Sequence, residues 1–358
     1  MGGLRGDPAR SGPVLPAGAE AAGVDGRSAA ELRLTADGLQ PEIAGWMRFA
    51  EGTLTGLQAR THLRAFGGLR RRLLERRVKQ LARPESRGEF IQVPRIDARR
   101  LPARTFRELL RSEATPIVLA GFAKDSPAVR EWTPEFLAER YGDVEMRYAS
   151  DSPECIKISA VVEGMRTGDD TKWVAGFNDL MVRHRELRAS LPLEEIERYS
   201  GESRTSGTEL FMGGRLTPYH CANFFNFFIM VHGVKKWTFV HPKHSVYMLA
   251  SANRDLLYVR SLLPVENEPP VPKLVTELQP GDVLLNPPWW WHKVENLTQA
   301  TIAVATRWAP LRQRFRSANS FYSWMQWMAP HQWKMLFLYQ LPRRDLTDKE
   351  VRWRFHRV

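Results

Sequence analysis

Short apolar runs alternate with glycine and proline turns between residues 210 and 308. Runs of this length, rich in aromatic and β-branched residues and bounded by turn formers, are typical of β-strands. We expect strands at residues 224–231, 236–240, 274–278, 282–286 and 301–308. Many short strands in succession predict a jelly roll or a small barrel.

The preceding segment mixes helical and extended patterns. Compact apolar runs predict strands at residues 91–96, 115–121 and 144–150, and helical spacing predicts helices at residues 105–111, 132–141 and 179–188. Thr133 is the expected N-cap of the second helix, with Pro134 at its first helical position.

Both ends of the chain depart from this pattern. Residues 1–38 are rich in Gly, Ala, Pro and Arg without apolar periodicity, which predicts a disordered leader. Residues 39–86 predict a basic amphipathic helical extension, which either docks on the body with its arginines solvated or attaches to an acidic surface. Residues 311–358 predict an aromatic-rich helical segment that covers the protein's own core or forms a homodimer interface. The β-rich domain occupies residues 87–310.

Composition limits the classes of protein to consider. A chain of 358 residues with 43% hydrophobic content can bury a substantial core. The formal net charge of +12 favours acidic partners, but many arginines lie in the terminal extensions. The sequence has no zinc-finger or other nucleic-acid recognition motif, so nucleic-acid binding is not expected. The two cysteines, Cys155 and Cys221, imply no disulfide framework, so the default expectation is a reducing, cytoplasmic setting. No apolar run of about 18 residues and no signal-peptide pattern occurs, so no transmembrane segment is expected.

Candidate chemistry is concentrated in two segments, residues 216–237 and 280–292. His220 follows Thr217-Pro218, where a strand that starts at a proline would direct the imidazole into a barrel. His292 follows a Pro-Gly-Asp turn and three tryptophans, and Lys235 lies fifteen residues after His220. Neutral imidazoles suit iron, although a lone histidine is more often a core residue.

These motifs together resemble the JmjC-related cupin-like oxygenases, a group that contains an asparaginyl hydroxylase. The resemblance covers residues 88–310 and rests on a set of short matches, each weak alone: Pro116-Ile-Val-Leu-Ala-Gly121, Trp132-Thr-Pro-Glu-Phe-Leu137, Tyr141-Gly-Asp143, Thr217-Pro-Tyr-His220, Gly233-Val-Lys235, Pro280-Gly-Asp-Val283 and Trp290-Trp-His292. It implies a mainly β fold with flanking helices, a double-stranded β-helix, that binds Fe(II) and 2-oxoglutarate.

The resemblance also implies roles for individual residues. His220 and His292 would be the metal ligands, and Lys235 would pair with the distal carboxylate of 2-oxoglutarate. A buried ammonium is costly unless an anion meets it, which supports that role, whereas Lys236 has the opposite strand parity and should face solvent. Thr217 and Asn226 match positions that contribute polar contacts in the cofactor pocket. Alternatively, the Thr217 hydroxyl stabilises a turn, and the Asn226 amide lies at the edge of a strand.

Other residues near these motifs receive weaker interpretations. We expect several aromatic residues to be barrel core rather than substrate contacts: Trp237, Phe225, Phe227, Trp290 and Trp308. Thr306 and Arg307 lie near the point where the family's last core strand faces the cofactor. The segment after His292 is one residue shorter than that of the asparaginyl hydroxylase, so neither residue is assigned a role.

Ala222 is the departure from the family pattern. The first ligand pair is usually His-x-Asp or His-x-Glu, and here it is His-Cys-Ala. A methyl group is no iron ligand, and on a regular strand Cys221 and Asn223 face the opposite side.

Three functions remain open. The first is a 2-oxoglutarate-dependent oxygenase that hydroxylates a C–H bond of a peptide, protein or small molecule; the second is a halogenase with chloride in the position left open; the third is a non-catalytic cupin-like binding protein.

Overall fold

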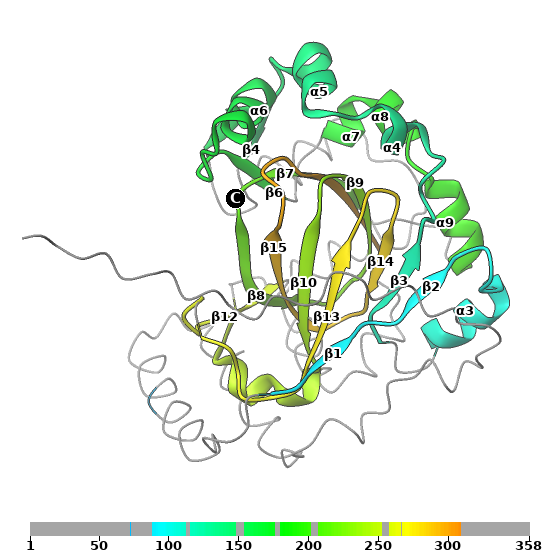
Figure 1. Ribbon diagram of the computed structural model, residues 1–358, viewed down its shortest axis with the longest axis vertical. Helices are drawn as coiled ribbons and strands as arrows, with labels where there is room; N and C mark the ends of the chain where they lie inside the picture. The colour runs from blue at the N-terminus through cyan, green and yellow to red at the C-terminus, as the bar shows by residue number, and fades with distance from the viewer. Residues whose placement is uncertain are drawn as a thin grey trace, which may run out of the picture.

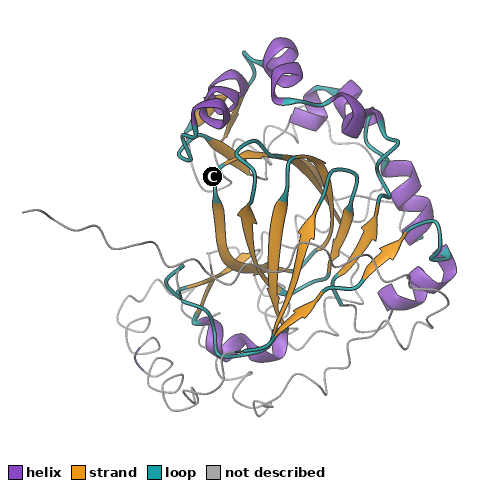
Figure 2. Ribbon diagram, viewed as in Figure 1, coloured by secondary structure: helices purple, strands orange, loops and turns teal. Residues whose placement is uncertain are grey.

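The computed structural model describes Arg72 and residues 88–308, except residues 112–114, 148–153, 176–179, 202–206, 253–257 and 266. Two sheets face each other, and helices follow the outer side of one of them (Figures 1 and 2). The expectations for residues 1–38 and 311–358, and nearly all of those for residues 39–86, lie outside the described residues. Within the described part of the chain, no helix is long and apolar enough to cross a bilayer.

The first sheet, sheet A, has seven strands in the order β1-β13-β10-β15-β8-β12-β11. In chain order they are β1 (Phe90–Gln92), β8 (Leu216–Ala222), β10 (Lys235–Val240), β11 (Ala250–Ala252), β12 (Tyr258–Ser261), β13 (Lys273–Leu278) and β15 (Trp291–Asn296). All its pairings are antiparallel except that of β1 with β13.

The second sheet, sheet B, also has seven strands, in the order β2-β3-β14-β9-β16-β7-β6. They are β2 (Arg95–Asp97), β3 (Ile117–Ala120), β6 (Trp173–Ala175), β7 (Gly207–Gly213), β9 (Phe225–His232), β14 (Val283–Asn286) and β16 (Ile302–Trp308). Because successive strands alternate between the two sheets from β7 to β10 and from β13 to β16, the chain winds as a jelly roll.

Helices and a small hairpin complete the described part. They are α3 (Ala103–Arg111), α4 (Pro127–Glu131), α5 (Pro134–Tyr141), α6 (Ile158–Thr167), α7 (Leu180–Arg183), α8 (Arg185–Ala189), α9 (Leu193–Ser200), the 3-10 helix η2 (Pro242–Met248), and the hairpin of β4 (Glu145–Arg147) and β5 (Cys155–Lys157). Figure 2 shows helices α3 to α9 in an arc beside sheet B and η2 at the opposite end of the molecule.

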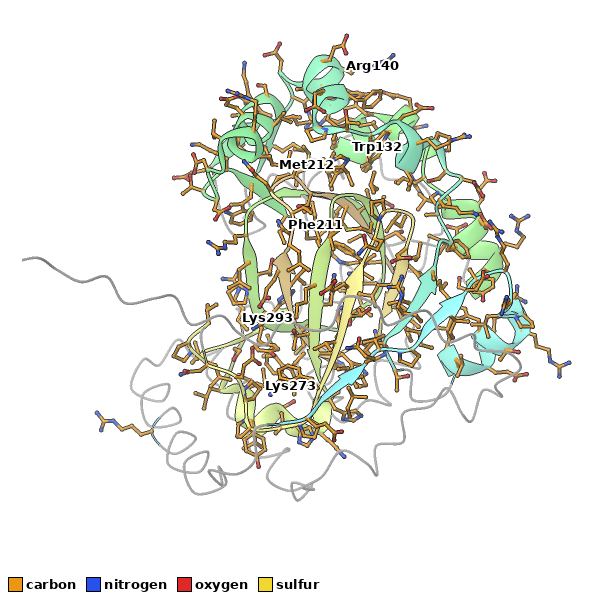
Figure 3. The ribbon with its side chains drawn as sticks, viewed as in Figure 1. Trp132, Arg140, Phe211, Met212, Lys273 and Lys293 are labelled. Atoms are coloured by element: carbon orange, nitrogen blue, oxygen red, sulfur yellow. The ribbon has the colours of Figure 1, made fainter. Side chains whose placement is uncertain are left out.

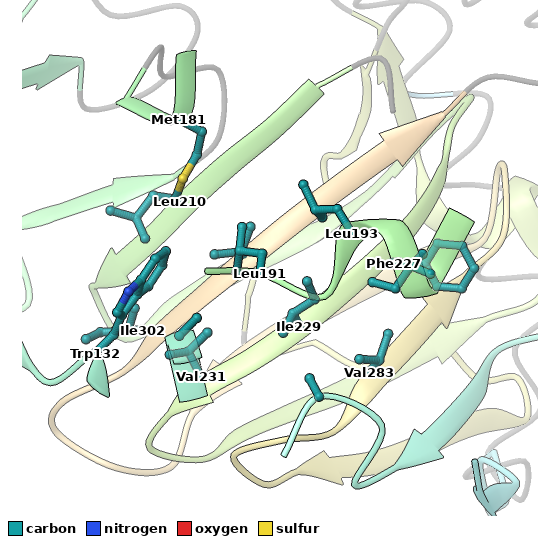
Figure 4. Close-up of a cluster of buried hydrophobic side chains, with 14 of the residues drawn as sticks. Trp132, Met181, Leu191, Leu193, Leu210, Phe227, Ile229, Val231, Val283 and Ile302 are labelled. Atoms are coloured by element: carbon teal, nitrogen blue, oxygen red, sulfur yellow. The ribbon is translucent and has the colours of Figure 1, made fainter. Parts of the chain in front are cut away.

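Two apolar cores follow from strand alternation. The inner core lies between the sheets and contains Phe228, Trp237, Phe239, Ala303 and Ala305 among its members. The outer core joins the other face of sheet B to the helices and is shown in Figure 4, where Phe227, Ile229 and Val231 of β9 meet Trp132 and Leu191. On β7 the neighbours Phe211 and Met212, labelled in Figure 3, pack against the inner and the outer core respectively.

Most of the expected strands and helices are present with shifted ends. The expected strands at 224–231, 236–240, 274–278, 282–286 and 301–308 correspond to β9, β10, β13, β14 and β16. The helix at 132–141 is α5, and Thr133 caps it as expected, since the Thr133 hydroxyl accepts a hydrogen bond from the Phe136 N–H at 3.1 Å.

Two expectations about single elements were wrong. Residues 91–96 form two strands in different sheets, because Pro94 offers no N–H and the chain crosses from sheet A to sheet B there. In place of the single helix expected at 179–188, the described residues from Leu180 onward form two short helices, α7 and α8, because the backbone of His184 leaves the helical region at φ −116° and ψ 80°.

Candidate functional site

Two histidines face each other across neighbouring strands of sheet A. His220 on β8 is directly opposite His292 on β15, and their ring centroids are 4.2 Å apart. His292 also lies opposite Phe239 of β10, a member of the inner core. Both imidazoles therefore project from the inner face of the sheet, as the sequence motifs predict.

Backbone carbonyl groups fix the tautomer of both rings. The Nδ1 atom of His220 lies 2.9 Å from the Pro218 carbonyl oxygen, and that of His292 lies 2.9 Å from the Trp290 carbonyl oxygen. Because a carbonyl oxygen only accepts, each Nδ1 carries the proton and each Nε2 carries the lone pair. Burial lowers the pKa of His220 and, together with the charge of neighbouring His220, lowers the pKa of His292 well below its usual value. Neutral imidazoles with Nε2 lone pairs are the form that binds transition metals.

The turn before β15 positions His292. Trp289 is fully buried and has a positive φ of 66°, a strained conformation for a bulky residue. Its N–H donates to the Ala222 carbonyl oxygen at 2.7 Å, which ties this turn to the end of β8. Trp237 stacks on His292 with a centroid distance of 5.2 Å and an interplanar angle of 24°. Tight packing on both strands therefore holds the two rings in register.

Lys235 lies on the same inner face at the other end of β10. The side chain is buried, with 5% exposure, and its ammonium group donates to the Asn296 amide oxygen. Burial lowers the pKa of Lys235 to about 7. Lys236 faces the opposite side and is only half-buried, beside Glu277 and Glu295 on the neighbouring strands. Phe239 is four positions after Lys235 on β10, so Lys235 lies about 13 Å along the strand from the level of His292.

Two amides lie beside His292 on sheet B. Asn226 on β9 is directly opposite Asn286 on β14, and both side chains are buried. The Asn286 amide nitrogen is 3.3 Å from Nδ1 and 3.5 Å from Nε2 of His292, so it sits beside the ring rather than in line with one lone pair. The amide oxygens of Asn226 and Asn286 and the indole N–H of Trp237 are buried without a hydrogen-bond partner. Buried polar atoms of this kind require a ligand or water to complete them.

The remaining predicted positions differ in placement. Thr217 is exposed and lies opposite Val294 of the inner core, on the same face as the histidines. Ala222 is half-buried and lies opposite Tyr258, whereas Cys221 is fully buried in a third apolar cluster on the outer face of sheet A. Among the described residues, no group of three or more His, Cys, Asp or Glu side chains is arranged to hold a metal ion.

The structure separates the aromatic residues into different environments. Trp237 and Trp290 belong to the inner core, as expected, but Phe225 and Phe227 belong to the outer core beneath the helices. The side chain of Trp308 lies outside the described residues.

Sequence reasoning missed three polar features of the interior. Asn286 was treated only as the end of a strand, Trp237 only as apolar packing, and Glu209 was not considered. Glu209 on β7 forms a buried ion pair with Arg307 on β16, inside the jelly roll. A charged residue within an otherwise apolar strand, Glu209 in Thr-Glu-Leu-Phe, is the signal that could have found it.

A comparison with protein families identifies the domain type. The sequence profile described as "Cupin-like domain" matches residues 102–313, which is more than half of the chain and includes both histidines and Lys235.

Proposed function

The chain belongs to the cupin-like domain family, and on that basis we propose that it is an Fe(II)- and 2-oxoglutarate-dependent oxygenase-like protein that oxidises a C–H bond. The family includes such oxygenases. The observation that carries the proposal is the pair of neutral imidazoles, His220 and His292, facing each other with both Nε2 atoms as acceptors.

The residues of the site fit 2-oxoglutarate and iron to different degrees. A dicarboxylate suits Lys235, because a buried ammonium gains most from an anionic partner. A divalent iron suits the two imidazoles, but the third protein ligand of a facial triad is replaced by Ala222. The unpartnered amide oxygens of Asn226 and Asn286 support this proposal, because buried acceptors gain from a polar occupant beside His292.

The side chains would share the work of binding and orientation. His220 and His292 would hold the metal, with the carbonyl groups of Pro218 and Trp290 fixing the rings. Lys235 would bind the distal carboxylate of 2-oxoglutarate, and Thr217 and Asn226 would contribute polar contacts. When bound, iron and 2-oxoglutarate would supply, with O2, the oxidation of a C–H bond, with release of succinate and CO2. Trp237, Phe239 and Phe228 would exclude water from this space.

The substrate is a peptide, a protein side chain or a small molecule. A direct test is anaerobic reconstitution with Fe(II), followed by measurement of succinate released from 2-oxoglutarate in the presence of oxygen. The proposal predicts slow, uncoupled succinate release that His292→Ala abolishes. Full iron occupancy without succinate release would contradict an oxygenase.

A second candidate is a non-catalytic binding protein of the same fold. Ala222 favours it, since the described residues offer two strong metal ligands rather than three. This candidate predicts that the folded protein binds dicarboxylates but takes up no iron. A halogenase, with chloride at the position left by Ala222, instead predicts chloride-dependent iron binding.

A further inference from the structure

A cleft of about 400 Å³ opens at the edge of sheet B, and its walls are the segments that follow β2 and β3 and the first half of α9. Strand β14 relates this cleft to the histidines. Asp282, just before β14, contacts Gly121 in the cleft wall, whereas Asn286 at the other end of β14 lies beside His292. Four positions on a strand span about 13 Å, so the cleft is distinct from the histidine site.

The topology explains why a cleft forms at this edge. Strands β2 and β3 are parallel neighbours joined through α3, so their carboxyl ends lie side by side. The chain turns away after each end, at Ala98 and at Gly121, and the two turns leave a crevice of the kind that binds ligands in α/β sheets. Helix α9 closes a third side, since the Tyr199 hydroxyl donates to the Leu101 carbonyl oxygen at 2.7 Å (Figure 1).

The less exposed part of the cleft lining is apolar. The Tyr199 ring stacks on Phe106 with 4.7 Å between centroids, and it meets Phe122 edge to face at 5.4 Å. Leu191 extends this surface. The hydroxyls of Tyr199 and Ser126 already donate to main-chain carbonyl oxygens. This surface therefore suits the apolar part of a ligand, and the polar recognition must come from elsewhere in the lining.

Four charged side chains of both signs surround the cleft. Arg99 and Lys124 are cationic, Asp125 and Glu195 are anionic, and all four are exposed. Each wall contributes at least one of them, because Arg99 follows β2, Lys124 and Asp125 follow β3, and Glu195 lies on α9. In the part of the chain that the structure describes, none of the four forms an ion pair. Cations and anions thus face one cleft from different walls without neutralising each other.

Hydrogen bonds fix the turn that carries Lys124 and Asp125. The Asp282 carboxylate accepts from the Gly121 N–H at 3.1 Å and is paired with Arg95 at 2.8 Å. Asp282 belongs to the Pro-Gly-Asp turn, which therefore positions this wall as well as β14. Since the wall is ordered without a ligand, less conformational entropy opposes binding.

We propose that this cleft binds a free amino acid with an apolar side chain. Lys124 and Arg99 would bind its carboxylate, and Glu195 would bind its ammonium group. The side chain of the ligand would lie against Phe122 and Tyr199. A zwitterion suits the cleft because it presents both charges on one small body, and a volume near 400 Å³ is at the lower end of the range of small-molecule pockets, about 300–1,000 Å³. The site does not depend on iron or 2-oxoglutarate.

The test is calorimetric titration of the full chain with L-phenylalanine and three analogues. 3-Phenylpropanoate lacks the ammonium group, 2-phenylethylamine lacks the carboxylate, and N-acetylphenylalanine amide lacks both charges. We expect L-phenylalanine to bind and each analogue that lacks one charge to bind about fivefold more weakly, the size of effect expected for an exposed ion pair. The uncharged analogue should bind most weakly.

Substitutions of exposed residues assign the two ends of the ligand without threatening the fold. Glu195→Gln should weaken L-phenylalanine binding about fivefold and leave 3-phenylpropanoate binding unchanged. Lys124→Gln should weaken L-phenylalanine binding to a similar extent and leave 2-phenylethylamine binding unchanged. Glu194→Gln is the matched control, because Glu194 is the exposed neighbour of Glu195 on α9 but does not line the cleft, and it should bind like the wild type.

Three results would overturn the proposal. The first is no saturable binding of L-phenylalanine to the wild type, and the second is equal affinity of the wild type and Glu195→Gln. The third is loss of L-phenylalanine binding when Fe(II) and 2-oxoglutarate are added anaerobically, which would place the amino acid in the histidine site. Each of these results leaves the proposed oxygenase function to its own test.

Discussion

Replacing Lys235 by methionine should stabilise the ligand-free protein. The pKa of Lys235 falls from 10.5 to about 7 because the ammonium is buried. This displacement corresponds to roughly 5 kcal/mol of cost for burying the charged form. Methionine fills similar volume without the charge but leaves the Asn296 oxygen without its donor, at a cost of about 1 kcal/mol. The net gain expected is therefore about 4 kcal/mol well below pH 7, and slightly less at pH 7, where half of the folded protein already carries neutral Lys235.

The gain should depend on pH. Between about pH 7 and pH 10.5 the unfolded chain holds a proton on Lys235 that the folded protein has released, so the stability of the wild type rises with pH across this window. The advantage of Lys235→Met should therefore be fully present below about pH 7 and lost near pH 10.5. Urea unfolding at a series of pH values measures it.

Lys236→Met is the matched control. Lys236 is the neighbouring residue, faces the opposite side and is half-buried, so its substitution should change stability by less than about 1 kcal/mol at any pH. Saturating 2-oxoglutarate should raise the stability of the wild type and of Lys236→Met but not that of Lys235→Met. The reasoning is refuted if Lys235→Met is the less stable protein at pH 7, or if 2-oxoglutarate protects it as well as it protects the wild type.

Three further substitutions test other parts of the account. Ala222→Asp should tighten iron binding at least about tenfold, because it completes a facial triad, and Ala222→Asn is the neutral control. Anaerobic iron titration measures both variants. Equal iron affinity of the wild type and Ala222→Asp would place the metal elsewhere. Gly233→Ala should cost about 2–4 kcal/mol, because Gly233 has a φ of 77° and a Cβ there would lie 2.1 Å from the Ala300 oxygen. Gly168 has the same φ of 77°, but a Cβ there would lie 3.6 Å from its nearest neighbour. Gly168→Ala should therefore cost only about 1 kcal/mol of backbone strain in denaturation experiments. Thr133→Ala should cost about 1 kcal/mol through loss of the α5 N-cap, and Thr133→Ser should restore it in thermal unfolding.

The fold was largely predictable because its strands are marked locally. Strands β9, β10, β13, β14 and β16 are marked by apolar runs next to glycine, proline or asparagine turns. Two-residue alternation then assigns the faces of residues such as Lys235 and Lys236. The inward direction of His220 was expected from the Thr217-Pro218 strand start, whereas its position opposite His292 depends on the register of β8 with β15. The helices beside sheet B were less predictable, since a single residue such as His184 interrupts the helical pattern without a glycine or proline.

The polar interior was not predictable because it depends on register between strands that are distant in sequence. Asn226, Asn286 and Arg307 come from three strands, and only the pairing of β9 with both β14 and β16 brings them to one level. The ion pair of Arg307 with Glu209 joins residues 98 positions apart. Phe225 and Phe227 were assigned to the barrel, but alternation on β9 directs them to the helices because Asn226 faces inward.

The central claim is that His220 and His292 form a metal site, and iron content measures it most directly. After anaerobic reconstitution and removal of unbound metal, the wild type should hold close to one iron per chain. His220→Ala and His292→Ala should each lose it while keeping a cooperative melting transition. His184→Ala, at a histidine on the helical side of sheet B, should retain it. A folded wild type without iron, or one whose iron survives loss of both His220 and His292, would contradict the claim.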